Sequence, residues 1–324
     1  MSSWRQIQKQ NFTDWKKLAA FLQIDTDHIL QRPRFSLNLP LRLAQKIKKN
    51  TPNDPILRQF LPTKEELKLT PGFATDAVGD GPARKAKKLL HKYKGRALIV
   101  CTSACAMNCR FCFRQKFPYE TEEKSFEDEI AAIAADPSIS EIILSGGDPL
   151  SLSDKTLQSL ISSLDKIPHL KRLRFHSRFP IGIPERIDAS FLNLLKSTRL
   201  QVVFIIHCNH PSELDTEVIA ALKKIQFLGI PILNQSVLLK GVNDSVATLK
   251  TLVEKLVDNG IMPYYLNQLD RVEGAAHFEV EVEKGMALLK QLASEVSGYA
   301  IPRYVQEIAG EPGKTTLLHP VEGL

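Results

Sequence analysis

The pattern of apolar and polar residues changes at about residue 96. Beyond that point, short apolar runs rich in β-branched residues alternate with segments whose apolar residues recur at helical spacing. This alternation predicts six strand–helix units, which favour a parallel sheet with right-handed crossovers. The predicted strands are residues 97–102, 141–146, 172–177, 201–207, 232–239 and 263–269, and the predicted helices are 126–135, 153–167, 191–197, 217–229, 246–260 and 285–296.

Residues 1–95 show no such alternation, and we expect them to be helical and irregular. Apolar residues at helical spacing predict helices at 41–50 and 64–69, the second entered through Pro62 and Thr63. In the later region, Ser153 is a predicted helix N-cap, and Gly229 and Gly260 are predicted left-handed C-caps. The chain therefore divides into an N-terminal extension (1–95), an α/β core (96–300) and a C-terminal segment (301–324).

Polar and reactive residues follow four of the predicted strands. A cysteine-rich loop follows the first strand, GGDP the second, HSR the third and HCNH the fourth. Both an open doubly wound sheet and a partial or full barrel fit the pattern, and in both architectures ligands bind at the carboxyl ends of the strands. The placement of these residues predicts an enzyme.

Composition narrows the class of protein. Of 324 residues, 43% are hydrophobic and 24% charged, which is typical of a globular chain and excludes disorder as the main state. The formal charge is +7, but the lysines are dispersed, which favours a solvated surface over nucleic-acid binding. We find no apolar run of about 18 residues and no apolar segment typical of a signal peptide. We therefore expect a cytoplasmic protein without a membrane partner.

Three of the five cysteines, Cys105, Cys109 and Cys112, form the pattern CxxxCxxC in the loop after the first strand. Thiolates suit zinc, copper(I) and iron–sulfur clusters. Tetrahedral zinc needs a fourth ligand, which His207, Cys208 or His210 could supply. Three thiolates hold three corners of a cubane and leave one iron open for a ligand. The other cysteines, Cys101 and Cys208, are predicted core thiols.

The CxxxCxxC loop resembles that of the radical S-adenosylmethionine superfamily. The resemblance implies a [4Fe-4S] cluster whose open iron binds S-adenosylmethionine. It also implies a partial (β/α)6, TIM-like radical SAM barrel. Reduction of the cluster implies an electron donor such as flavodoxin or ferredoxin.

A second reactive residue, Lys314, lies in the turn GEPGKT near the end of the sequence. A P-loop would need glycine at position 308, where the chain has isoleucine. A lysine at the mouth of a barrel suits a Schiff base, although a solvated turn lysine is the simpler interpretation of this motif alone.

From about residue 54 onward the chain resembles the lysine 2,3-aminomutase family. The stretches that carry the resemblance are DPILRQFLPT, HKYKGRALIV, CRFCFRQ, SGGDPLSLSD, HSRFP, HCNHPSE, NQSVLLKGVND, PYYLNQLD and GKT. It implies that Lys314 carries pyridoxal 5′-phosphate. By the same resemblance, Lys92, Tyr93 and Arg96 lie near the cofactor phosphate, and Gly146, Gly147, Asp148, Ser177, Arg178, His207 and Gln235 contact S-adenosylmethionine.

The resemblance also implies a substrate and a reaction. Arg114 matches the arginine that binds the substrate α-carboxylate, and Asp270 and Glu307 match the acids that bind the ε-ammonium. Two anions at the far end favour lysine and would repel glutamate. The implied activity is that of an isomerase, a radical 2,3-aminomutase that converts (S)-α-lysine to (R)-β-lysine.

Some features depart from the longer members of the family. GEPGK replaces GGGGK, Asn267 replaces a tyrosine near the cofactor, and the chain ends ten residues after Lys314. It is most similar to the short subgroup whose β-lysine is attached to elongation factor P by a lysyl ligase. The alternatives are an aminomutase that releases free β-lysine and, more distantly, a basic RNA- or ribosome-binding protein with a structural cluster.

Overall fold

The computed structural model describes residues 3–120 and 125–317. Within them a single ten-stranded sheet runs in the order β1 to β10. Strands β3 to β9 pair in parallel, and β1, β2 and β10 join the two edges antiparallel. The strands are β1 (Arg84–Ala86), β2 (Leu89–Tyr93), β3 (Arg96–Val100), β4 (Glu141–Ser145), β5 (Arg172–Ser177), β6 (Gln201–His207), β7 (Ile232–Val237), β8 (Met262–Asn267), β9 (Arg303–Gln306) and β10 (Thr315–Thr316).

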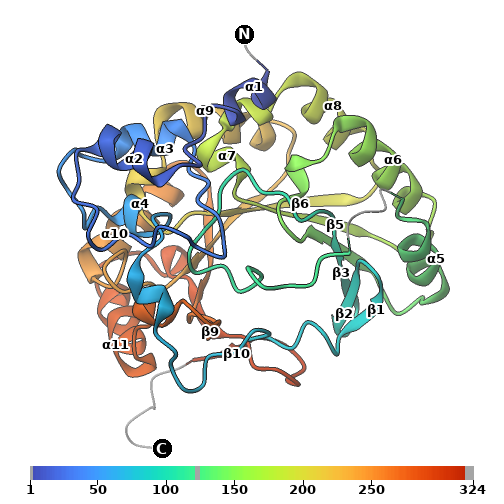
Figure 1. Ribbon diagram of the computed structural model, residues 1–324. Coiled ribbons are helices and arrows are strands. Elements are labelled where there is room, and N and C mark those ends of the chain that lie inside the picture. Colours follow the sequence, from blue (N-terminus) through green and yellow to red (C-terminus); the bar gives the residue numbers. More distant parts are fainter. Residues whose placement is uncertain (1–2, 121–124, 318–324) are drawn as a thin grey trace, which may run out of the picture.

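The six predicted strand–helix units are confirmed. Each strand from β3 to β8 is followed by one long helix, and Figure 1 shows these helices in an arc around the outside of the curved sheet. This arrangement is the predicted α/β partial barrel. The helices are α5 (Glu127–Ala135), α6 (Asp154–Asp165), α8 (Ala189–Ser197), α9 (Thr216–Gln226), α10 (Val246–Val257) and α11 (Val282–Ala293), and a short helix α7 (Phe179–Gly182) precedes α8.

Local signals at the helix ends agree with the sequence. The Ser153 hydroxyl accepts a hydrogen bond from the backbone N–H of Thr156 and caps α6. Gly229 and Gly260 follow α9 and α10 with φ of +76° and +69°, the left-handed conformation expected of them. Apolar faces of the helices pack on the sheet and bury residues such as Leu160 and Phe204 completely or nearly so.

The prediction that residues 1–95 lack strands is wrong at β1 and β2. These two strands form an antiparallel hairpin edge on β3, with Leu90 opposite Leu98. Their lysine-rich sequence has no clear two-residue apolar alternation, so pairing with β3 decides the conformation. Strands β9 and β10 were also not predicted, because they have only four and two residues. The division into three regions stays a prediction, and the last seven residues of the third lie outside the described part.

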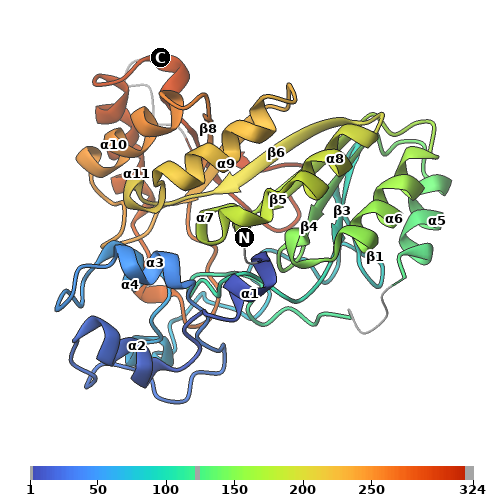
Figure 2. The same ribbon diagram turned by 90° about the horizontal axis from the view of Figure 1, so that it is seen from above.

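The N-terminal extension lies across the open side of the sheet, as Figure 2 shows from above. Its side chains hold the cysteine loop: Asn11 Nδ2 donates to the carbonyl of Ala106 at 2.8 Å, and Asn38 Nδ2 donates to that of Cys105 at 3.3 Å. The extension contains α1 (Trp4–Gln8), α2 (Trp15–Leu22), α3 (Leu41–Lys46), α4 (Pro55–Arg58) and the 3-10 helix η1 (Lys64–Leu67); further 3-10 turns are η2 (Pro149–Ser151), η3 (Pro184–Arg186), η4 (Pro211–Glu213), η5 (Ala276–Phe278) and η6 (Gly298–Ala300).

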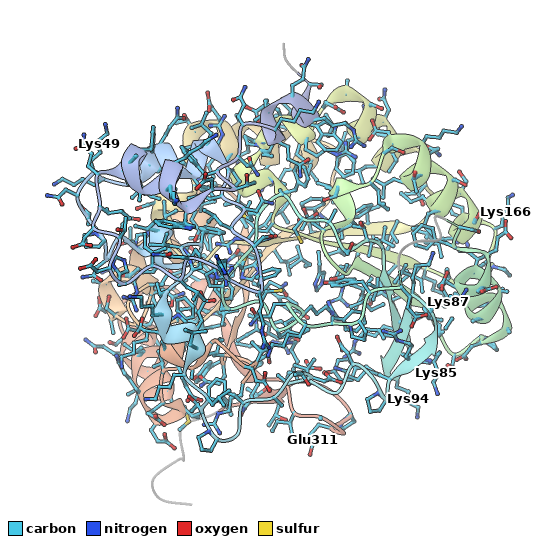
Figure 3. All side chains as sticks on the ribbon, viewed as in Figure 1. Lys49, Lys85, Lys87, Lys94, Lys166 and Glu311 are labelled. Atoms are coloured by element: carbon cyan, nitrogen blue, oxygen red, sulfur yellow. The ribbon has the colours of Figure 1, made fainter. Side chains whose placement is uncertain are left out.

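Basic side chains are dispersed over the surface. Figure 3 shows Lys49 and Lys166 projecting from opposite sides of the molecule, and Lys94 is likewise exposed. In the described residues we find no helix with both the length and the apolar composition needed to cross a membrane.

Candidate active site

A cavity of about 570 Å³ opens on the inner side of the sheet. Strand residues two positions apart line it, as the alternation of side chains along a strand requires. Examples are Arg174 and His176 on β5, and Tyr265 and Asn267 on β8. All seventeen predicted site residues lie on its wall: Lys92, Tyr93, Arg96, Cys105, Cys109, Cys112, Arg114, Gly146, Gly147, Asp148, Ser177, Arg178, His207, Gln235, Asp270, Glu307 and Lys314.

The three cysteines of the loop are partly buried and face this cavity, whereas Cys101 and Cys208 are buried core thiols, as predicted. Burial raises the pKa of Cys112 to about 11, so its thiolate form requires a nearby cation. Among residues 3–120 and 125–317, no three His, Cys, Asp or Glu side chains are grouped so as to hold one metal ion. A cubane cluster bonds each thiolate to a different iron, so its ligands need not converge on one point.

Arg178 connects the cysteine loop to the sheet. Its Nη1 lies 2.8 Å from the Cys109 sulfur, and its Nη2 donates to Glu213 at 2.8 Å and to Gln59 at 2.7 Å. Arg178 is 7% exposed and Glu213 is fully buried. The positive charge beside Cys109 favours a thiolate there, and the buried acid compensates that charge on the other side.

The two glycines after β4 allow the cysteine loop to pass close by. A Cβ atom at Gly147 would lie 2.4 Å from the carbonyl oxygen of Ala104, closer than any real contact. Gly146 has φ of +113°. The backbone N–H of Gly147 donates to the carbonyl of Thr102 at 2.6 Å. Glycine at both positions is therefore needed for the loop to take this path.

Asp148 uses its carboxylate to join the ends of β4 and β5. It accepts hydrogen bonds from the Ser177 hydroxyl at 2.9 Å and from the backbone N–H groups of Leu150, Arg178 and Phe179 at 3.0, 2.8 and 3.0 Å. Burial raises the pKa of Asp148 to about 6, and these donors limit the rise. Asp148 thus holds together the segments that follow β4 and β5. Its predicted contact with S-adenosylmethionine stays a prediction.

Lys314 projects into the cavity from the segment just before β10. Its Nζ donates to Asn267 Oδ1 at 2.8 Å and lies 3.3 Å from Glu307 Oε2. Asn267 Nδ2 donates to the carbonyl of Ser236 at 2.9 Å, which fixes the amide so that its oxygen faces Lys314. The side chain of Lys314 is 27% exposed. A nucleophilic amine therefore stands within the same cavity as the three thiols.

The two predicted acids for the substrate ammonium differ in their surroundings. Glu307 binds Lys314, Lys92 and the Tyr93 hydroxyl, so its oxygens are already used. The carboxylate of Asp270 accepts no hydrogen bond from the described residues, and burial raises its pKa to about 6. Asp270 is consequently the acid that is open to a cationic ligand in this conformation.

Lys92 also differs from its predicted surroundings. Its ammonium donates to the Val78 carbonyl at 2.8 Å, to Asp80 at 3.0 Å and to Glu307 at 3.1 Å, which uses all three N–H groups. Arg96 stacks on the Tyr93 ring, with its guanidinium 4.6 Å from the ring centre. Of the residues predicted near the phosphate, Arg96 is therefore the cation that remains available.

Asp80 is the clearest residue that the sequence interpretation missed. It lies in a glycine-containing turn, is 3% exposed, and bonds both Lys92 and Arg114. Another missed residue on the cavity wall is Arg174, whereas His176 lies there as part of the predicted HSR stretch, which gave it no individual role. The Nε2 atoms of His176 and His207 and the Nε atom of Arg178 are buried without a partner in the described structure. Burial lowers the pKa of His207 to about 3, so its ring is neutral at physiological pH.

Comparison with known proteins identifies the family. A family model described as a 4Fe-4S single cluster domain matches residues 94–174, which include the three cysteines of the loop. An L-lysine 2,3-aminomutase of Haemophilus influenzae is 43% identical over 320 residues, covering 97% of this chain and 95% of that protein. This chain belongs to the L-lysine 2,3-aminomutase family. An L-lysine 2,3-aminomutase of Escherichia coli is 41% identical and covers 94% of this chain and 91% of that protein.

Other members of the L-lysine 2,3-aminomutase family are longer than the matched region. The protein of that name from Clostridium subterminale is 37% identical over 273 residues, which is 83% of this chain and 65% of that protein. A solved radical SAM methyltransferase from Sphaerobacter thermophilus is 20% identical, with a TM-score of 0.49 over 67% of this chain and 68% of that chain. The family predicted from the sequence is confirmed, and with it an enzyme of the isomerase type.

Proposed function

We propose that this protein moves the amino group of L-lysine from carbon 2 to carbon 3 and forms β-lysine. The observation that carries the proposal is the joint presence of Cys105, Cys109, Cys112 and Lys314 on the wall of one cavity. An iron–sulfur ligand set and a Schiff-base lysine are the attachment points of two different cofactors. Their placement around a single space supports one reaction that uses both.

The chemistry of the residues fits each of the three cofactors. The cysteine thiols suit a [4Fe-4S] cluster, and the buried unpartnered nitrogens of His207 and Arg178 suit the polar groups of S-adenosylmethionine. Lys314 suits pyridoxal 5′-phosphate, with Arg96 as a donor to its phosphate. When bound, these groups supply a hydrogen-abstracting radical and a π-system across which nitrogen can migrate.

The residues of the chain bind and orient the substrate. The guanidinium of Arg114 offers a fork for the α-carboxylate, and Asp270 offers a negative charge for the ε-ammonium. Asn267 and Glu307 hold the amine of Lys314 whenever it is not attached to the cofactor. The N-terminal extension packs over the cysteine loop and holds it through hydrogen bonds from Asn11 and Asn38.

We further propose that the product is (R)-β-lysine and that it serves the modification of elongation factor P through a partner lysyl ligase. The stretch CFRQKFPY, which begins at Cys112, supports this assignment. We also propose a cytoplasmic location and, as the electron donor, a small carrier of the flavodoxin or ferredoxin type. We expect neither a membrane nor a nucleic acid as a partner.

The activity is tested by reconstituting the protein with iron, sulfide and pyridoxal phosphate in the absence of oxygen. It is then incubated with L-lysine, S-adenosylmethionine and a reductant, and β-lysine is measured by chromatography. We expect β-lysine from the native protein and none from Lys314→Ala. The exposed Lys290→Ala serves as a matched control that keeps full activity. Formation of β-lysine by Lys314→Ala at the native rate would refute the cofactor assignment.

The destination of the product is tested separately. Elongation factor P and its ligase are incubated with the reconstituted protein and L-lysine, and the mass of elongation factor P is measured. An added β-lysyl group is expected only when this protein is active. Abundant free β-lysine without any transfer would favour the alternative of an aminomutase that releases its product.

A further inference from the structure

Asp80 connects two cationic side chains of the cavity and has no role in the proposed reaction so far. We propose that Asp80 is a positioning residue that fixes the guanidinium of Arg114 and so sets the recognition of the substrate α-carboxylate. This inference rests on the proposed function, because it assumes that Arg114 binds the carboxylate of lysine.

The turn that carries Asp80 is held by its own hydrogen bonds. The carboxylate of Asp76 accepts the backbone N–H groups of Asp80 and Gly81, each at 2.9 Å. Gly79 has φ of +69°, and a Cβ atom there would lie 3.1 Å from the Cβ of Ala309. The turn therefore fits closely against the segment that leads to Lys314, and the Asp80 side chain is directed inward at 4% exposure.

Asp80 occupies one side of the Arg114 guanidinium and leaves the other side open. Its Oδ2 accepts from Arg114 Nε at 2.8 Å. A guanidinium can bind a carboxylate through its Nε side or through its two terminal nitrogens. With the Nε side occupied, the pair of terminal nitrogens remains for the substrate. Nη1 lies 3.5 Å from the Ser145 hydroxyl, and the Phe113 ring centre is 4.7 Å from the guanidinium carbon.

Asp80 also separates two positive charges. Its Oδ1 lies 3.0 Å from Lys92 Nζ, and Lys92 in turn lies 3.1 Å from Glu307. Burial alone would raise the pKa of Asp80, but the charges of Arg114 and Lys92 outweigh burial and hold that pKa below its usual value. The carboxylate is therefore ionised throughout the physiological range.

These contacts form one chain of alternating charges from the carboxylate-binding end to the cofactor lysine. Its order is Arg114, Asp80, Lys92, Glu307 and Lys314, and each neighbouring pair lies within 3.3 Å. Asp80 is the acid next to Arg114 in this series of contacts. Without its charge, Arg114 and Lys92 would repel each other, and the fork would lose its fixed orientation.

The experiment compares two ligands that differ only in the carboxylate. L-Lysine and cadaverine, which is lysine without its carboxylate, are titrated into the reconstituted holoprotein without reductant. Binding is followed through the absorbance of pyridoxal phosphate. The variants are Asp80→Asn, Arg114→Met, the double variant and the exposed control Asp258→Asn.

We expect Asp80→Asn to weaken L-lysine binding about ten-fold or more and to leave cadaverine binding unchanged. Arg114→Met should show the same selectivity, and the double variant should be no weaker than Arg114→Met alone. Asp80→Glu, which keeps the charge, should recover part of the affinity. Asp258→Asn should match the native protein for both ligands.

Equal weakening for both ligands, or fully additive losses in the double variant, would overturn the proposal and indicate a purely structural role. Unchanged L-lysine binding by a folded Asp80→Asn would overturn it as well. If Asp80→Asn does not fold, the binding of L-lysine and of cadaverine is compared in Asp80→Glu. Weaker binding of L-lysine alone supports the proposal, and equal weakening for both ligands overturns it. Failure of the native holoprotein to convert lysine would refute the proposed function instead, which distinguishes the two failures.

Discussion

The amine of Lys314 donates a hydrogen bond to the side-chain oxygen of Asn267 at 2.8 Å. Asn267 cannot easily turn away, because its amide nitrogen is bound to the backbone carbonyl of Ser236. The contact shows what the asparagine does here: it holds the lysine amine in the cavity with a neutral acceptor. The GEPGK turn likewise still delivers Lys314 to the cavity.

Replacing Asn267 with leucine should slow the attachment of pyridoxal phosphate to Lys314. The variant removes the acceptor that directs the amine, and a hydrogen bond to a charged group contributes about 1.5–3 kcal/mol. We expect a decrease of about ten-fold in the rate at which the visible absorbance appears after mixing protein and cofactor. The exposed Asn193→Leu is the control. An unaltered rate in Asn267→Leu would show that the contact is incidental.

Adding a methyl group at Gly147 should prevent assembly of the cluster. The new Cβ would lie 2.4 Å from the Ala104 carbonyl, so the cysteine loop would have to move. Iron and sulfide per chain after anaerobic reconstitution are expected to fall strongly in Gly147→Ala. Gly298→Ala, which meets nothing within 4 Å, should retain the native content. Native iron content in Gly147→Ala would contradict the steric argument.

Removing the charge of Arg178 should destabilise the fold. Arg178→Met leaves the fully buried Glu213 without its cationic partner, a change that typically costs about 3–5 kcal/mol. The free energy of unfolding from denaturant titration measures the loss. Arg172→Met removes a partly exposed pair with Glu141 and should cost at most about 1 kcal/mol. Similar losses in the two variants would mean that the Arg178–Glu213 pair does not stabilise the fold as a buried ion pair.

The affinity for L-lysine should fall as the pH drops through about 6. Burial raises the pKa of Asp270 to about 6, so below that pH the carboxyl group is neutral and no longer attracts the ε-ammonium. Glu307 does not produce this step, because Lys314 and its other partners outweigh burial and lower its pKa. Equilibrium titrations between pH 5 and 8 measure the effect. Asp270→Asn should bind weakly with no step near pH 6, and a step that persists in this variant would assign it to another group.

The same shift predicts how stability depends on pH. The folded pKa of Asp270 lies above its unfolded value of 3.8, so the folded state binds the extra proton between about pH 4 and 6. The Asp270 contribution to stability therefore declines as the pH rises through this window. Asp270→Asn removes the decline and should unfold at a higher temperature than the native protein at pH 7. A lower melting temperature at pH 7 would mean that the carboxylate is stabilised by the fold.

The six strand–helix units could be predicted because each strand has at least five residues with apolar side chains in succession or at alternate positions, and each following helix has an apolar face. Strands β1 and β9 could not, since Arg84–Ala86 and Arg303–Gln306 are short, partly charged and ordered by their neighbours. Propensity is a weak signal for such edge elements. Pairing with β2 and β8 decides their conformation.

The location of the site could be predicted from the cysteine spacing and the residues that follow β3 to β6. The contacts within it could not, because they depend on segments far apart in sequence. Asp80 in DAVGDGP is typical of an exposed turn, yet Lys92 and Arg114 make it a buried acid. Lys92 matched a phosphate ligand by position, but its three N–H groups are used within the protein.

The central claim is that the cluster loop and Lys314 serve one rearrangement of lysine within one cavity. Its most direct test uses L-lysine labelled with 15N at the α-amino group, incubated with the reconstituted protein, S-adenosylmethionine and a reductant. Nuclear magnetic resonance then locates the label. The account predicts that the label moves to carbon 3. A label that stays on carbon 2, in protein with an intact cluster and bound pyridoxal phosphate, would contradict it.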